Sequence, residues 1–235
     1  TDLKTNGTVN ELSGVVSLKS SLPMQKSELN FTKTFSPTFM LRYAPGQMKN
    51  LRDDDIFLSY SNLYSLNKTS EIESGFSTIL GFDYKYNEIK EDATEKERLS
   101  ISMGQIFNQK KNKNLPTKSS LNRRMSDLVG SVNYNFSDIG NIGYSFSLDN
   151  NYTDLNYNEI STGLNFGKIS FNLNYLEQAN HVGNEHYINS GISLDINENN
   201  TLGFATKKNF KTDSTELYDI NYQYEIDCLT AGLTF

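Results

Sequence analysis

Apolar and polar residues alternate along most of the second half of the chain. Between residues 142 and 148, the apolar residues Ile142, Tyr144, Phe146 and Leu148 alternate with glycine and serine. Successive side chains of a β-strand point to opposite faces of the sheet, so this pattern predicts strands with one apolar and one polar face. The same alternation recurs in residues 169–175, 188–196 and 218–224.

The predicted strands are about ten residues long, and the connections between them are alternately short and long. Strands of soluble sheets usually have about five or six residues, whereas about 9–11 residues cross a bilayer at a tilt. In outer-membrane barrels the short turns are periplasmic and the long loops are external, so the alternation also predicts orientation. The short connections are residues 138–141, 166–167, 197–200 and 225–228, and the longer ones are residues 150–155, 177–185 and 211–215.

The first half of the chain is less regular. A short strand is predicted over residues 12–18, followed by a turn at residues 21–26 that contains Pro23. Residues 27–43 are predicted to be one extended segment with a bulge or bend at Pro37, because proline cannot donate to a strand ladder. Residues 44–75 form a long connection without a clear period, which is usually functional or disordered.

Three further strands complete the pattern, and they bring the total to about twelve, within the range known for outer-membrane barrels. They are predicted over residues 78–86, 98–109 and 125–137, and they are separated by a charged loop at 87–97 and a basic loop at 110–124.

Composition favours a membrane barrel over a soluble β-sandwich, which would also show alternation. Only 36% of the residues are hydrophobic and the mean hydropathy is −0.56, which is low for a soluble core of this size. In a transmembrane barrel only one face of each strand must be apolar, and the 14 Tyr and 14 Phe suit the aromatic girdles at the membrane interfaces. The predicted fold class is all-β, a transmembrane antiparallel up-and-down β-barrel.

The net charge bears on the class of ligand, and the two ends of the chain bear on whether it is part of a longer protein. The net charge of −6 and the pI of about 5.0 argue against a nucleic-acid surface. Residues 1–10 lack the basic start and apolar stretch of a signal peptide, so we expect a mature piece or an internal fragment. Residues 229–235 follow a short, periplasmic connection and should run outward. A barrel of even strand number ends by descending, so we expect at least one further strand beyond Phe235.

Five stretches carry a combination of motifs that is hard to attribute to chance. They are FSPTFMLRYAP (35–45), SNLYSLNKTSEIESGFSTILGFDYKY (61–86), ISMGQIFNQK (101–110), SDLVGSVNYNFS (126–137) and YEIDCLTAGLTF (224–235). Together they resemble the C-terminal part of the barrel in the LPS-assembly outer-membrane protein family (LptD, or organic solvent tolerance protein). The resemblance covers most of the chain from about residue 12. The Asn-Leu-aromatic-Ser…Glu-x-Gly run and the Gly104-Gln105 strand are its moderately specific parts.

The resemblance implies that residues 1–235 are the C-terminal portion of an outer-membrane barrel domain, without its N-terminal jelly-roll domain and its final strand. The implied function is assembly of lipopolysaccharide (LPS) into the outer leaflet of the bacterial outer membrane. The glycan would pass through the lumen, and release would occur at a seam formed by strands that this chain lacks. The implied partners are LPS, an LptE-like lipoprotein plug and an LptA-like periplasmic bridge. No cofactor and no nucleic acid are implied.

The single cysteine lies where the resembling family carries disulfide-forming cysteines. Cys228 is at the last short turn, and many family members have two adjacent cysteines there, whereas this chain has one. The resemblance implies one disulfide from Cys228 to a cysteine of the periplasmic N-terminal domain, which is outside this chain. A lone buried thiol is the alternative, although an oxidising compartment favours pairing.

The basic loop is a candidate site for the phosphates of LPS, because the predicted orientation places it outside the membrane. Lys or Arg against phosphate forms a charge-assisted contact. A flexible solvated loop is the alternative. The acidic run Asp53-Asp54-Asp55 could share divalent cations with LPS, but an ordinary charged loop is the simpler interpretation. The candidate contact residues are Lys110, Lys111, Lys113, Lys118, Arg123 and Arg124.

Two other functional classes fit the composition less well. A passive porin or nutrient channel would need the same polar lumen, and composition alone does not separate it from an LPS translocon. An outer-membrane enzyme is disfavoured because the chain has only His181 and His186, which makes a Ser-His-Asp hydrolase improbable. Both histidines and Glu185 are predicted to lie in one solvated loop rather than in a metal site.

Overall fold

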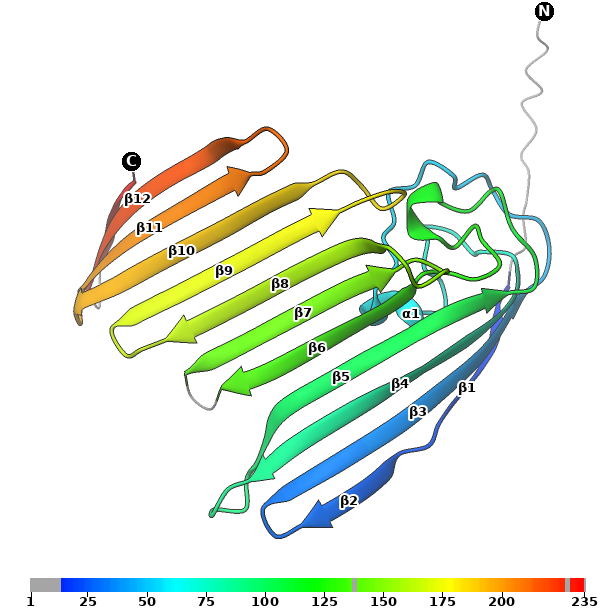
Figure 1. Cartoon of the computed structure of the whole chain (residues 1–235), viewed down its shortest axis with the longest axis horizontal. Helices are drawn as coiled ribbons and strands as arrows, with labels where there is room; N and C mark the ends of the chain where they lie inside the picture. The colour runs from blue at the N-terminus through cyan, green and yellow to red at the C-terminus, as the bar shows by residue number, and fades with distance from the viewer. Residues whose placement is uncertain (1–13, 137–138, 227–228, 235) are drawn as a thin grey trace, which may run out of the picture.

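The protein, seen in a computed structural model, is a single antiparallel sheet (Figure 1). The structure describes residues 14–136, 139–226 and 229–234. A search of these residues finds no helix with the length and apolar character needed to cross a membrane. The strands are β1 (Val16–Ser21), β2 (Met24–Glu28), β3 (Phe31–Ala44), β4 (Gly75–Ile89), β5 (Glu95–Asn108), β6 (Leu128–Phe136), β7 (Gly140–Leu148), β8 (Leu155–Asn165), β9 (Ile169–Gln178), β10 (His186–Asn197), β11 (Asn200–Asn209), β12 (Ser214–Ile226) and β13 (Leu229–Thr234).

The sheet has simple up-and-down connectivity. From β3 to β13 every strand pairs with the next strand in the sequence, and both β1 and β2 pair with β3. Within the described residues β13 does not pair with β1 or β2, so the sheet is open. The all-β, up-and-down fold predicted from the sequence is therefore confirmed, and the open sheet is consistent with a partial barrel.

Cross-strand register sorts the alternating residues into two faces. Leu173 lies between Thr162 and Ser190 on one face, and its neighbour Asn174 lies between Ser161 and Asn189 on the other. The first face carries most of the exposed large hydrophobic side chains of the sheet, and we call it the membrane face. The polar face is called the lumen face. Exposed membrane-face residues include Leu80, Ile142, Ile192, Leu202, Phe204 and Ile220.

The edge strand is built differently from the prediction. Pairs Ser21↔Thr38 and Met24↔Phe35 follow one continuous register, so β1 and β2 are two parts of a single edge strand. The predicted turn at residues 21–26 is wrong, because Pro23 only interrupts this strand. An edge strand tolerates proline, whose missing N–H can face away from the ladder. The hairpin turn comes later, at Leu29 and Asn30.

The predicted bulge at Pro37 is also absent, since β3 and β4 pair without a register shift. The carbonyl of Pro37 accepts a hydrogen bond from Leu22 N at 3.0 Å. The N and C=O of one strand residue face the same neighbour, so the missing donor of Pro37 faces the edge strand beside its interruption. The ladder between β3 and β4 therefore stays intact.

The charged loop predicted at residues 87–97 is mostly strand. β4 continues to Ile89 and β5 begins at Glu95, which leaves a turn at residues 90–94. The charged side chains pair across this hairpin: Arg98 binds Glu88, and Lys85 Nζ lies 2.9 Å from Glu97 Oε2. Because opposite charges face each other, a polar sequence can form a strand here.

Most long connections lie at one end of the sheet and the short ones at the other, as the sequence predicts (Figure 1); the exception is the connection at residues 210–213, which is one residue shorter than the turn at residues 90–94. The rule for outer-membrane barrels places the long loops outside, so we call their side the outer end. The connections at the outer end are residues 45–74, 109–127, 149–154, 179–185 and 210–213, and short turns at the other end are residues 29–30, 90–94, 166–168 and 198–199.

Candidate functional site

The loop at residues 45–74, called the inward loop, folds back onto the lumen face. Its short helix α1 (Tyr60–Leu63) contacts β5 and β6. Leu58 and Leu63 are buried in the main hydrophobic cluster of the protein. The long connection is therefore ordered, and it covers part of the lumen face instead of projecting from it (Figure 1). The sheet residues of this cluster are Met40, Ile79, Ile106 and Val129.

These four sheet residues are apolar although they occupy lumen-facing positions. They contact the inward loop, so they break the polar pattern only where the loop covers the sheet. The period-two alternation does not by itself predict this exception. Apolar residues at lumen-facing positions of four neighbouring strands, β3 to β6, are the signal that could have predicted a loop inside the lumen.

Two glycines allow α1 to lie close to the sheet. A Cβ atom at Gly81 would lie 2.4 Å from Tyr64 Oη, and one at Gly104 would lie 2.5 Å from Leu63 Cδ2. Both distances are far below van der Waals contact, so any larger residue would displace the helix or the strand. Gly81 and Gly104 are paired across β4 and β5, which makes a flat surface for the helix.

Arg42 fixes the last part of the inward loop. It is only 3% exposed, and it donates to Leu66 O at 2.6 Å and to Glu73 O at 2.8 Å. The Glu73 carboxylate in turn accepts hydrogen bonds from the backbone N–H groups of Lys68 and Thr69. Burial lowers the pKa of Lys68. Glu73 is the glutamate of the Glu-x-Gly motif noted in the sequence, and its role here is to fold the loop.

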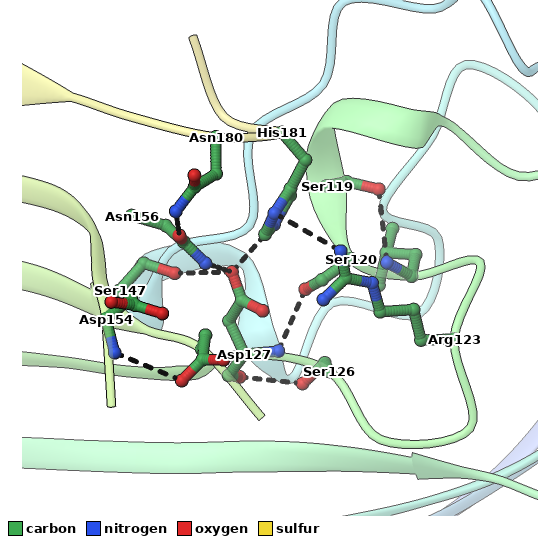
Figure 2. Close-up of polar contacts among 12 residues, drawn as sticks. Ser119, Ser120, Arg123, Ser126, Asp127, Ser147, Asp154, Asn156, Asn180 and His181 are labelled. Atoms are coloured by element: carbon green, nitrogen blue, oxygen red, sulfur yellow. Dashed lines mark hydrogen bonds and ion pairs between the residues drawn. The ribbon is translucent and has the colours of Figure 1, made fainter. Parts of the chain in front are cut away.

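A second cluster, the Asp127 cluster (Asp127, Ser147, Asn156 and His181), joins other connections at the outer end (Figure 2). Asp127 is 1% exposed, and its Oδ2 accepts hydrogen bonds from Ser147 Oγ at 3.1 Å and Asn156 Nδ2 at 2.9 Å. His181 Nε2 lies 2.8 Å from the same oxygen. One buried carboxylate therefore connects the loop before β6 with β7, β8 and the loop before β10.

The predicted solvated loop is correct in part: His181 lies in the loop at residues 179–185 and Glu185 is exposed, but neither histidine is exposed. The side chain of His181 is 12% exposed, and Arg123 Nη2 lies 3.5 Å from its Nδ1. His186 is the first residue of β10, and its Nε2 lies 3.0 Å from Tyr175 Oη. The partner Asp127 is far away in the sequence, so no local pattern could indicate the contact.

The Asp127 cluster does not have the geometry of a hydrolase triad. In the described part of the chain, no serine hydroxyl hydrogen-bonds to the His181 ring, and the nearby Ser147 donates to Asp127 instead. A Ser-His-Asp site needs the serine on the histidine. Residues 14–136, 139–226 and 229–234 also contain no group of three or more His, Cys, Asp or Glu side chains that could hold a metal ion.

The six basic candidates are in different environments. Lys118 Nζ pairs with Asp55 Oδ1 at 3.1 Å, and Arg123 contacts His181. Lys110 and Lys111 line a crevice of about 310 Å³ beside Arg42. Among the described residues, no side-chain partner is found for Lys110, Lys111, Lys113 or Arg124, all of which are exposed. These four cations are therefore available to a ligand at the outer end.

The acidic run beside the basic loop is partly used within the protein. Asp55 pairs with Lys118, and Asp54 Oδ2 accepts a hydrogen bond from Ser70 Oγ at 2.7 Å. Cys228 lies outside the described residues, so its disulfide stays a prediction. The strands beside it pair at Ile226 and Leu229.

The chain matches a protein-family model over most of its length, whereas its similarity to solved structures is weak. Residues 1–200 match the family model LptD, LPS transport system D. Two mutant forms of the Rhodopseudomonas blastica porin give TM-scores of 0.34 and 0.32, with 9% and 10% identity. Both alignments cover 99% of this chain and 95% of the porin. TM-scores of this size carry no functional argument.

No curated protein matches the chain. The family model, however, spans most of the sequence, and the sheet has the two faces of an outer-membrane wall. The chain therefore belongs to the LptD family of LPS transport proteins and is a β-strand protein of the bacterial outer membrane.

Proposed function

We propose that this chain forms part of the wall of a translocon that assembles LPS into the outer leaflet of the outer membrane. The observation that carries the proposal is the division of one sheet into an exposed apolar face and a polar face, in a chain of the LPS transport family. The apolar face suits lipid. The polar face suits the hydrated glycan of LPS, which must avoid the hydrocarbon of the bilayer.

The inward loop limits where the glycan can pass. Helix α1 lies on β5 and β6, and the buried cluster around it uses side chains of β3 to β6. On the lumen face of β7 to β12, this loop packs at the outer end of β8, where the rings of Phe57 and Tyr157 have centroids 4.4 Å apart. We therefore assign the glycan path to the rest of the lumen face of these later strands.

The basic loop supplies contacts for the phosphates of LPS at the outer end. Lys110, Lys111, Lys113 and Arg124 are exposed and have no partner among the described residues. Each can form a charge-assisted hydrogen bond with a phosphate oxygen. Lys118 and Arg123 are assigned a structural role instead, because they bind Asp55 and His181.

The partners follow from the family resemblance. An LptE-like lipoprotein plug in the lumen and an LptA-like bridge on a periplasmic N-terminal domain complete the proposed translocon. We also propose that Cys228 forms a disulfide with that domain. A non-reducing gel of the full-length protein should show a mobility shift that Cys228→Ser abolishes, and an unchanged pattern would remove Cys228 from the proposal.

Photo-crosslinking in cells tests the transport role. A photoreactive amino acid is placed at Ser193, which lies on the lumen face of β10, or at Leu194, which lies on the membrane face beside it. Both positions are near the short-turn end, where the surrounding leaflet is phospholipid. LPS adducts are expected at Ser193 and not at Leu194.

The same experiment separates a translocon from a porin. A passive channel has no LPS in its lumen, so equal absence of adducts at both positions would contradict the transport role. Adducts at Leu194 alone would also contradict it, because LPS would then be outside the wall.

A further inference from the structure

Asparagine and glycine repeatedly face each other on the lumen face of β6 to β12. In antiparallel sheets, directly opposed residues place their side chains on the same face and next to each other. Most of the sheet's lumen-facing glycines in these strands are opposed by an asparagine. The pairs, together called the Asn–Gly ladder, are Asn133↔Gly143, Asn141↔Gly163, Asn172↔Gly163, Asn172↔Gly191 and Asn221↔Gly203.

The asparagine side chains lie over the glycines. Asn172 Oδ1 is 2.4 Å from the place that a Cβ of Gly191 would occupy, and Asn221 Oδ1 is 2.3 Å from the corresponding place at Gly203. A real Cβ does not come this close to another atom, so glycine is required for these side chains to fold down. The ladder is therefore a flat patch of amide groups that is spread over three adjacent cross-strand rows of the sheet.

The amides of the ladder are unused within the described residues. No side-chain hydrogen bond is found there for Asn133, Asn141, Asn172 or Asn221. Asn172 and Asn221 also line a groove of about 510 Å³ that extends from β7 to β12, and its lining combines polar groups such as Ser193 with apolar residues such as Leu164 and Phe171. The groove thus offers free donors and acceptors along several strands.

The chemistry of this patch selects a neutral ligand that is rich in hydroxyl groups. Each amide has two donors and an acceptor oxygen, so it can pair with sugar hydroxyls in either direction. The asparagines and glycines of the ladder carry no charge, and the nearest carboxylate in register with them is Asp219, which follows Asn172, Gly191 and Ala205 in one cross-strand row. The free cations of the basic loop lie at the outer end. Several similar weak sites also suit a ligand that must move on, since release requires that no single site bind tightly.

We propose that the Asn–Gly ladder is a contact track for the glycan of LPS on its way through the lumen. This inference rests on the proposed transport role and adds the residues that touch the sugar. It assigns the phosphates of LPS to a different place, the basic loop.

The test uses the full-length protein in cells, with the photoreactive residue at Ser193. The yield of LPS adducts is compared between the unaltered ladder and the pair Asn172→Ala and Asn221→Ala. Loss of one hydrogen bond between an asparagine and the glycan weakens binding of the glycan by about fivefold, so the adduct yield should fall by at least about fivefold. Ser190→Ala is the control, because it removes a polar group from the membrane face of β10, the strand that carries Ser193. It should leave the adduct yield unchanged.

A second arm does not depend on any substitution in the ladder. In cells that make LPS with a truncated glycan, the adduct yield at Ser193 should fall in the same way while the ladder is intact. Unchanged yields in both arms would overturn the ladder and leave the transport role standing. If Ser193 gives no LPS adduct even with full-length glycan, the transport role itself fails, and the ladder fails with it.

Discussion

At the scale of single residues, a few buried polar groups hold the outer end together. Asp127 accepts hydrogen bonds from two neighbouring strands and contacts a third connection through His181. Arg42 does the same for the inward loop by binding its backbone. Each group is nearly inaccessible to solvent, so each lost partner leaves another polar atom unsatisfied.

Replacing Asp127 with alanine should loosen the loop at residues 179–185. Ser147 and Asn156 would lose their acceptor, at a cost of about 1–3 kcal/mol for each buried group left unsatisfied. Limited proteolysis of intact cells measures the effect as faster cleavage in this loop. Asp127→Asn keeps the size and one acceptor oxygen, so cleavage should increase less. Identical cleavage of all three proteins would show that the cluster does not hold the loop.

Asp149 gives the β7–β8 loop a predictable response to pH. Its carboxylate accepts backbone hydrogen bonds from Thr153 at 2.9 Å and Asp154 at 3.3 Å, and these bonds lower its pKa. Its stabilising contribution is therefore complete above the ordinary aspartate pKa of about 3.9 and is lost as the pH falls through the lowered value.

Amide exchange at Thr153 tests this pH dependence. At neutral pH, Asp149→Asn should make the Thr153 amide exchange faster than in the unaltered protein. Below the lowered pKa the two proteins should become alike, because Asp149 is then protonated. A difference that persists unchanged into strong acid would rule out the carboxylate as the cause.

At the scale of elements, the fit of α1 and of Tyr64, the residue after it, against the glycines of β5 and β4 decides where the inward loop lies. A Cβ at Gly104 would also lie 2.7 Å from the backbone oxygen of Leu80. The added methyl group would therefore clash with the backbone of β4 as well as with Leu63. Overpacking of this kind costs about 1–3 kcal/mol. Gly104→Ala should therefore release α1 from the sheet.

Chemical labelling measures that release. A cysteine placed at Leu58, which is only 2% exposed and belongs to the same buried cluster, leaves Leu63 in place; it should react slowly with an external thiol reagent and faster when Gly104→Ala is added. Gly232→Ala is the control, since its nearest atom is 3.7 Å from the new Cβ and no shift is needed. Equal labelling with both alanines would mean that the glycine does not set the position of α1.

The sequence predicted regular strands well and irregular elements poorly. Alternation located β7 to β12, where each residue faces either lipid or water. It did not locate the hairpin turn at Leu29 and Asn30, because Pro23 is a stronger turn signal although it only interrupts an edge strand. It also did not reveal the Asp127 cluster, whose members are brought together by the sheet and not by any local spacing.

At the scale of the whole molecule, one sheet separates two environments. The membrane face continues across the strands as exposed apolar side chains, and the lumen face is polar except beneath the inward loop. The two faces were predictable from the period of two. The position of the inward loop was not, because it depends on tertiary contacts of Leu63 and Tyr64 with two glycines in different strands.

The most direct test of this division is a pair of charge substitutions at neighbouring positions in the middle of β9. Leu173 faces the membrane and Asn174 faces the lumen, where its Nδ2 lies 2.9 Å from Glu159 Oε1. Leu173→Arg should cost about 2–4 kcal/mol of folding free energy in a bilayer, as expected for arginine at the midplane. Asn174→Arg should cost little, because it places the charge in water beside Glu159. Folding titrations in lipid vesicles measure both values, and equal costs on the two faces would contradict the account.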